Sequence, residues 1–184
     1  MEVDCSTFVV LDIPEPTSSE IRTVREHYND RTRLALPIEI TVAGSSGVGP
    51  FVVGQELDDI FSALDDIAHE TAPIDVELAE VLRFPNTNVF VLTVKDESPF
   101  EALHKRILGS GFEFYPSNFP YRPHCTLVIK EPDSDDDANR LMNFRLEHKF
   151  VRLDRLSVYG IKPREDGLEI PTVNLLYRTN LTGA

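Results

Sequence analysis

The sequence lacks the features that would tie it to a membrane, a metal or an oxidising compartment. Its only two cysteines, Cys5 and Cys125, form no metal-ligand spacing and no disulfide framework, which favours a reducing cytoplasm. No apolar segment approaches the roughly 20 residues of a membrane span. The first residues, MEVDCSTFVVLDIPEP, have no basic region and only a short apolar run, so we expect no signal peptide. The sequence thus predicts a cytoplasmic protein without a membrane partner.

Positive charge is also scarce. The 184 residues contain 18 Lys and Arg against 31 Asp and Glu, which gives a formal charge of −13. Such a chain repels a long polyanion, so extended duplex DNA or RNA is a poor partner, whereas a nucleotide or a short RNA end needs only a few local donors. With 41% hydrophobic and 27% charged residues the composition is that of a globular protein. We expect a monomer with a single domain spanning residues 1–184.

The hydrophobic pattern switches repeatedly between strand and helix periods. Two-residue alternation and short apolar runs predict strands at Phe8–Ile13, Leu36–Ala43, Ile74–Leu78, Val89–Val94, His124–Lys130, Phe150–Ile161 and Thr172–Arg178. Helical spacing predicts helices from Thr17 to Tyr28, over Gln55–His69, from Ser98 to Gly109 and near Asp135–His148. Thr17 and Glu20 form a predicted capping box, and Ser134 is a predicted N-cap.

The order strand, helix, strand, helix, strand occurs twice, approximately over residues 6–85 and 86–184. The two halves share this order rather than residue identity. Internal duplication of this kind usually produces two lobes with a cleft between them. Glu39 and His124 lie on corresponding strands of the two halves, so we expect their side chains to face each other across the cleft.

Each of these two strands carries a polar pair on one face: Glu39 with Thr41, and His124 with Thr126. The segment PHCTLV, with a strand-borne His-x-Thr and a related strand about 85 residues earlier, resembles the two-histidine (2H) phosphoesterase superfamily. That group includes the 2'-5' RNA ligase-like proteins and the cyclic phosphodiesterases. The resemblance covers nearly the whole chain through the order of its elements. It implies an α+β fold of two pseudo-symmetric lobes, each an antiparallel sheet flanked by helices, with a central cleft.

The resemblance also implies a mechanism that needs no cofactor and no metal. In that superfamily each lobe contributes one His-x-Thr or His-x-Ser to the cleft. The two imidazoles act as general base and general acid on a 2′,3′-cyclic or other phosphodiester, and the hydroxyls bind the phosphate oxygens. His124 and Thr126 match the second motif and Thr41 matches the hydroxyl of the first, but Glu39 stands where the superfamily has its first histidine.

A carboxylate at this place changes the expected chemistry. Glutamate is ionised at neutral pH, so Glu39 would repel a phosphate and would raise the pKa of His124 by attraction. His124 would then be the acid and Glu39 the base for hydrolysis or transfer at a 2′,3′-cyclic phosphate or an RNA end. The alternative is a catalytically silent member that binds a nucleotide or a protein.

Three further residues before the His124 strand are candidates for ligand binding. Arg122 has the parity of His124 and is expected to clamp the phosphate, although a surface arginine at a strand end is an equal alternative. Tyr115 and Tyr121 are candidates for stacking on a base, with local packing as the alternative.

Other patterns carry no predicted chemistry. His69–Thr71 also spells His-x-Thr, but at the end of a predicted helix, so we interpret it as a coincidence. The acidic run Asp133–Asp137 imitates the first ligands of a calcium loop. The residues after it do not supply the glycine and the final glutamate that such a loop needs, so we expect no calcium site. The remaining histidines, His27, His104 and His148, lie on predicted helices and are expected at surface or boundary positions.

Overall fold

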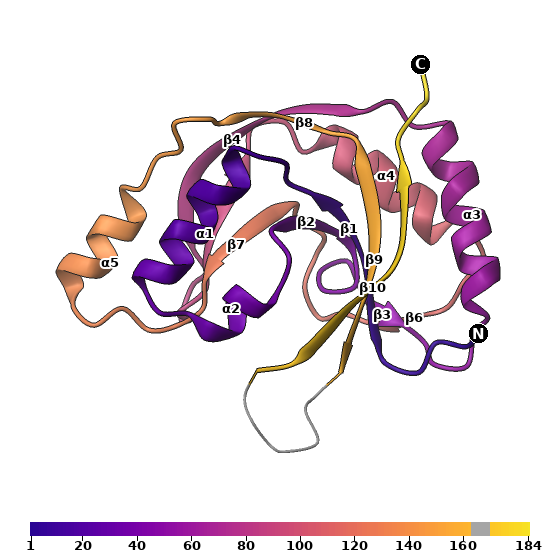
Figure 1. Ribbon diagram of the computed structural model, residues 1–184, viewed down its shortest axis with the longest axis horizontal. Helices are drawn as coiled ribbons and strands as arrows, with labels where there is room; N and C mark the ends of the chain where they lie inside the picture. The colour runs from indigo at the N-terminus through magenta and orange to yellow at the C-terminus, as the bar shows by residue number, and fades with distance from the viewer. Residues whose placement is uncertain (163–169) are drawn as a thin grey trace.

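The computed structural model describes residues 1–162 and 170–184 (Figure 1). The strands in this part are β1 Ser6–Asp12, β2 Glu39–Ala43, β3 Val48–Phe51, β4 Ile74–Arg83, β5 Phe90–Val94, β6 Phe114–Pro116, β7 His124–Val128, β8 Phe150–Leu153, β9 Arg155–Lys162 and β10 Thr172–Asn180. The helices are α1 Thr17–His27, α2 Arg31–Ala35, α3 Leu57–His69, α4 Ser98–Leu108 and α5 Asp135–Met142. None of these helices has the length and apolar character of a membrane span.

The strands form two four-stranded antiparallel sheets, ordered β10-β9-β1-β2 and β7-β5-β4-β8, and a small sheet of β3 and β6. β2 and β7 are edge strands of the two large sheets, and they lie side by side at the centre of the molecule (Figure 1). α3 packs against β10, α4 against β2, α1 against β7 and α5 against β4. The fold is therefore α+β with two lobes and a central cleft, as predicted.

Each large sheet takes strands from both halves of the sequence. β4, from the first half, pairs with β5 and β8, whereas β9 and β10, from the second half, extend the sheet of β1 and β2. An internal duplication over residues 6–85 and 86–184 stays a prediction. β2 and β7 nevertheless have equivalent places, because each pairs antiparallel with the strand that opens its half, β1 or β5.

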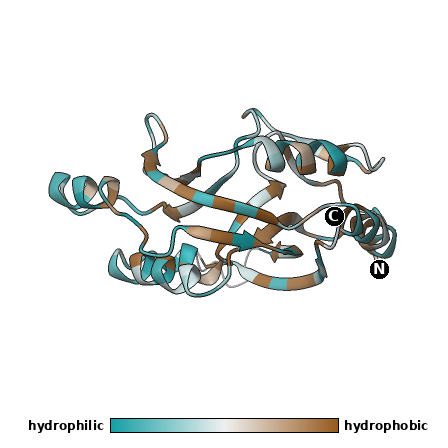
Figure 2. Cartoon of the chain, turned by 90° about the horizontal axis from the view of Figure 1, so that it is seen from above, coloured by the Kyte–Doolittle hydropathy of each residue, from teal (hydrophilic) through white to brown (hydrophobic). Residues whose placement is uncertain are grey.

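The hydrophobic core determines which face of β2 and β7 is left for the cleft. In Figure 2 the hydrophobic residues concentrate on the strands through the middle of the molecule. Ile40 and Val42 of β2, and Cys125 and Leu127 of β7, are fully buried in the core. Because successive strand residues point to opposite faces, the polar residues between them face away from this core.

The predicted strand Phe150–Ile161 is two strands in two different sheets. β8 pairs with β4 and β9 pairs with β1, and the chain crosses between the sheets at Asp154. The buried leucines on either side, Leu153 and Leu156, are three residues apart, a spacing that a single strand cannot place on one face. This change of parity is the signal that the sequence prediction overlooked.

Three short elements were not predicted. α2 occupies Arg31–Ala35, so the strand predicted from Leu36 begins only at Glu39. β3 overlaps the GSSGVGP connection, and it pairs with β6, a strand of three residues. Elements this short are stabilised mainly by tertiary contacts, so local sequence carries little signal for them.

The predicted capping box at the start of α1 is wrong. The hydroxyl of Thr17 donates to the carbonyl of His148 (2.6 Å), and Glu20 accepts from two backbone N–H groups in the same segment. These side chains therefore hold the chain after α5, which ends before His148, instead of capping α1. Ser134 does cap α5, as predicted, by accepting from the backbone N–H of Asp137 at 3.2 Å.

A buried arginine joins α1 to both edge strands. Arg25 is 1% exposed, and its Nη1 donates to the carbonyls of Arg33, Leu36 and Pro37 at 2.7, 3.1 and 3.2 Å. Its Nη2 donates to the carbonyl of Thr126 at 2.8 Å. Burial lowers the pKa of Arg25 to about 10, so the guanidinium remains charged at neutral pH. Arg25 thereby holds α2 and the approach to β2 against β7.

Asp30 holds the same junction from the other end of α2. Its Oδ1 accepts from the backbone N–H of Arg33 at 3.0 Å and caps the helix. Its Oδ2 accepts from the backbone N–H groups of Ile129 and Lys130, just after β7, at 2.7 and 3.2 Å. A single carboxylate thus connects the start of α2 to the end of β7.

We expect Arg25→Leu to lower the free energy of unfolding by about 2 to 4 kcal/mol, because four backbone carbonyls lose their donor in a buried place. Urea denaturation followed by circular dichroism measures the change. Arg22→Leu, at an exposed position of the same helix, is the control and should change stability by less than about 0.5 kcal/mol. Equal effects of the two substitutions would contradict the anchoring role of Arg25.

Candidate active site

A cavity of about 210 Å³ opens where β2 and β7 meet. Its lining brings together the four cleft residues expected from the sequence: Glu39 and Thr41 from β2, and His124 and Thr126 from β7. The other lining residues include Arg33 from α2 and a more apolar set, Phe8, Val10, Tyr159 and Ile161. The cavity therefore has polar and apolar parts.

The imidazole of His124 is held in one tautomer. Its Nδ1 lies 2.7 Å from the carbonyl of Arg122, and a carbonyl can only accept, so Nδ1 carries the proton and Nε2 has a free lone pair. The ring also meets the edge of Phe84, with centroids 5.3 Å apart. Burial lowers the pKa of His124, with a smaller contribution from Arg33 and against the effect of the Arg122 carbonyl. The expected imidazolium is therefore wrong, and the neutral base is favoured.

Glu39 is buried rather than solvated, with 9% of its surface exposed. Its Oε2 accepts from the hydroxyl of Thr41 at 3.0 Å, and its Oε1 lies 3.9 Å from Nη2 of Arg33. Burial raises the pKa of the Glu39 carboxyl, although Arg33, Thr41 and Arg25 act in the opposite direction. Glu39 therefore differs from an ordinary exposed glutamate, because its protonated form is favoured relative to water.

Arg33 is the main feature of the cavity that the sequence did not indicate. Its side chain is 12% exposed, and its Nε and Nη2 are buried without a hydrogen-bond partner among the described residues. Unsatisfied buried donors are costly, so their presence in a cavity wall suggests a site for an anion. The only sequence signal is Asp30 followed by Arg-Thr-Arg, an N-cap before one basic turn.

Residues 13–162 match the model of the 2'-5' RNA ligase superfamily. The chain belongs to this superfamily. This membership confirms the family that the His124 motif and the order of elements predicted. No curated protein matches the sequence at a significant level.

Two solved structures share the fold of this superfamily member at low sequence identity. TT0787 of Thermus thermophilus is 17% identical with a TM-score of 0.64, and the alignment covers 100% of this chain and 99% of that one. Escherichia coli LigT, solved in complex with 3'-AMP, is 14% identical with a TM-score of 0.65, covering 97% of this chain and 98% of LigT. At these identities the likeness establishes the fold of the superfamily member and nothing finer.

Arg122 and Tyr115, expected to bind a ligand, do not belong to the described cavity lining. Nε of Arg122 lies 3.5 Å from Oε1 of Glu97, and 53% of the Arg122 side chain is exposed. Arg122 contributes instead through its carbonyl, which orients His124. Tyr115 lies exposed on β6. The arginine in the cavity wall of this superfamily member is therefore Arg33 and not Arg122.

Tyr121 is packed inside the protein instead of standing free for a base. Its ring stacks on His104 with centroids 4.0 Å apart, and its hydroxyl donates to the carbonyl of Thr41 at 3.3 Å. His104, which was expected near the surface, is 6% exposed and bonds through Nδ1 to the carbonyl of Val42 at 2.7 Å. The two rings therefore support β2 from behind the cleft.

The second His-x-Thr tripeptide lies away from the cavity. Nδ1 of His69 bonds to the carbonyl of Asp65 within α3, and the side chain is exposed. The acidic run begins α5, and no group of three or more His, Cys, Asp or Glu in the described residues is arranged to hold a metal ion. Neither pattern adds a ligand-binding group to the cleft.

We expect Arg33→Met to weaken the binding of inorganic phosphate by about tenfold or more, because the buried donors are removed. The free energy of unfolding should stay within about 1 kcal/mol of the parent value, since those donors make no hydrogen bond among the described residues and the ion pair with Glu39 is long, at 3.9 Å. The rise of Tm with phosphate concentration measures both effects. Arg31→Met, an exposed neighbour on α2, is the control. A variant that loses stability but keeps the phosphate effect would show that Arg33 is only structural.

Proposed function

We propose that this protein hydrolyses or transfers at a 2′,3′-cyclic phosphate, or at another phosphodiester of an RNA end, by acid and base catalysis without a metal. The observation that carries the proposal is the tautomer of His124, whose Nε2 lone pair belongs to a cavity that is also lined by a carboxyl group of raised pKa. A nucleotide ligand is supported by the relative E. coli LigT, whose structures are complexed with 3'-AMP, ATP and NADP+.

The proposed roles are the reverse of those expected from the sequence. Nε2 of His124 takes a proton from water, and the water oxygen forms a bond to phosphorus. The bond from phosphorus to one ribose oxygen breaks, and the protonated carboxyl of Glu39 gives that oxygen its proton. The product is a phosphomonoester. Arg33 and Thr126 hold the phosphate oxygens during this exchange.

Turnover of nucleoside 2′,3′-cyclic phosphates in EDTA tests this function. His124→Ala and Glu39→Gln should each lower kcat by about 10²- to 10⁴-fold, since each removes one proton-transfer group. His69→Ala changes the histidine of the other His-x-Thr, outside the cavity, and should leave kcat unchanged.

The substrates should also include short 2′-5′ and 3′-5′ oligonucleotides, so that either class of phosphodiester can be detected by chromatography. No turnover of any of them, or turnover that is equal in the parent and in His124→Ala, would refute the proposed catalysis.

The pH profile should be bell-shaped. The base must be neutral, so the rate rises with pH through the pKa of His124, which burial places below the usual imidazole value. The acid must be protonated, so the rate falls as pH rises through the pKa of Glu39, which burial places above the usual glutamate value. Measuring kcat/KM against pH should show that the residual activity of Glu39→Gln has lost the alkaline limb. An alkaline limb that persists in this variant would assign the acid to another group.

A catalytically silent nucleotide-binding protein is the second candidate, and one contact favours it. The hydroxyl of Thr41 already donates to Glu39, so it is not free to bind a phosphate oxygen. This candidate predicts that nucleotides raise Tm without forming product, and that Glu39→His, which installs the residue of the 2H motif, produces hydrolysis. The absence of any nucleotide effect on Tm would exclude it.

A further inference from the structure

The carboxylate of Glu39 lies between two groups that a phosphate oxygen would use. Oε2 accepts a hydrogen bond from the hydroxyl of Thr41, and Oε1 is 3.9 Å from a guanidinium nitrogen of Arg33 that has no other described partner. When Glu39 is ionised, an anion is therefore already present beside the donors of the cavity. A phosphate ligand that enters the cavity must then bind next to this carboxylate.

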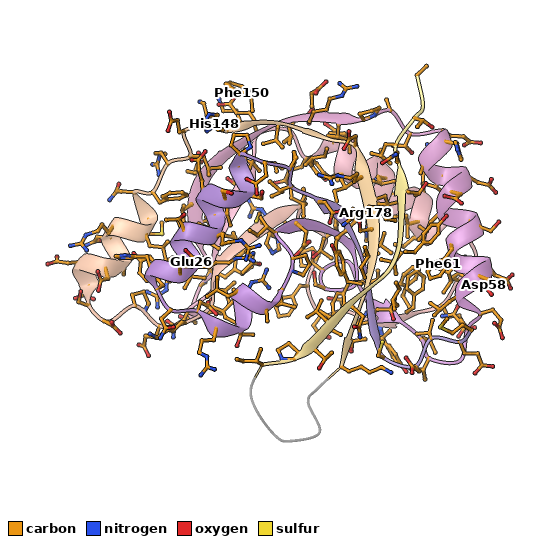
Figure 3. The ribbon with its side chains drawn as sticks, in the orientation of Figure 1. Glu26, Asp58, Phe61, His148, Phe150 and Arg178 are labelled. Atoms are coloured by element: carbon orange, nitrogen blue, oxygen red, sulfur yellow. The ribbon has the colours of Figure 1, made fainter. Side chains whose placement is uncertain are left out.

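The titratable groups that share the cavity of Glu39 or interact with it electrostatically are Arg25 of α1, Arg33 of α2, Asp12 of β1, His124 and Cys125 of β7, Tyr121 before β7 and Tyr159 of β9. Asp12 is matched by Arg178 of β10, 2.8 Å away, whose place is marked in Figure 3. Burial favours the neutral form of His124, of Cys125 and of both tyrosines, as their pKa shifts indicate. Arg122 is matched by Glu97, 3.5 Å away. Among the described residues, the remaining charges around the cavity are two guanidinium groups and one carboxylate.

We infer that Glu39 makes the cavity selective for phosphate groups with a single negative charge, as in a phosphodiester, over doubly charged phosphomonoesters. With Glu39 ionised, one positive charge remains, which a monoanion neutralises. A dianion leaves an excess negative charge in a buried place where repulsion is weakly screened. The inference deepens the proposed function, because it assigns the charge class of its substrate.

Catalysis would use the same charge to release the product. Glu39 gives its proton to the leaving oxygen, so it becomes charged in the step that turns a diester into a monoester. The monoester then loses its own second proton, whose pKa is about 6. At neutral pH the carboxylate of Glu39 and the doubly charged monoester repel each other, so the product leaves the site that accepted the substrate.

Protonation of Glu39 should remove the selectivity. Lowering the pH through the pKa of its carboxyl, which burial raises, neutralises the group and lets a dianion bind. The discrimination should therefore be largest at alkaline pH and should decline as the pH falls. Because the monoester itself also loses charge near pH 6, the comparison is made against a variant without the carboxylate at each pH.

The test uses two ligands that differ by one methyl group and one charge: 2′-deoxyadenosine 3′-phosphate and its methyl ester. Neither has the 2′-hydroxyl needed to form a cyclic phosphate. Isothermal titration calorimetry in EDTA at pH 8 gives the Kd of each for the parent protein, for Glu39→Gln and for Glu39→His. Glu26→Gln is the matched control, because it removes the same charge from an exposed position on α1 (Figure 3).

The parent and Glu26→Gln should bind the methyl ester about tenfold to a hundredfold more tightly than the monoester. Glu39→Gln should gain about tenfold in affinity for the monoester and change little for the methyl ester. An unchanged ratio in Glu39→Gln and Glu39→His, or no binding of either ligand to the parent, would overturn the inference. Binding with this ratio but without turnover of cyclic phosphates would refute the catalysis and leave the charge selectivity standing.

Discussion

The hydrogen bonds from the buried guanidinium of Arg25 to four backbone carbonyls are the interaction on which the cleft depends. The acceptors belong to α2, to the approach to β2 and to β7, so one side chain fixes three segments relative to one another. A buried charge is costly unless it is paired or hydrogen-bonded, so these four bonds restrict the backbone path of all three segments. Because Arg25 bonds the carbonyls of both Arg33 and Thr126, the backbone positions of these two cavity residues are held relative to each other.

Burial then sets the chemistry of the cleft. It disfavours the charged form of both partners, so the pKa of Glu39 rises while the pKa of His124 falls. In water the same two groups would form a carboxylate and, at mildly acid pH, an imidazolium. In the cavity they tend toward a neutral base and a protonated acid, which are the states that opening a phosphodiester requires. In the proposed function, the local guanidinium charges of Arg25 and Arg33 offset the formal charge of −13 where the anion would bind.

Strand parity and the order of the elements were enough to predict much of the fold and four residues of the candidate site. Parity alone placed Glu39 with Thr41 and His124 with Thr126, and the fold brings all four to one cavity. Parity failed for Arg122, because that residue precedes β7 and its side chain pairs with Glu97. Arg33 escaped prediction because a helix of five residues leaves too short a pattern. Its position is set by Arg25 of α1 and by the contacts of Asp30, the N-cap of α2, with the end of β7.

The sequence by itself determined the superfamily, the two-lobed α+β fold and the two strands that carry the cleft, because these follow from a repeated order of hydrophobic periods and one short motif. Only the tertiary structure decided which arginine lines the cavity, and that burial shifts the pKa values of Glu39 and His124 in opposite directions. Charge placement and pKa depend on burial and on neighbours distant in sequence, and these exist only once the chain has folded. For the same reason Glu39, an ordinary acid in the sequence, becomes a buried acid that governs both proton transfer and the charge of the ligand in the proposed function.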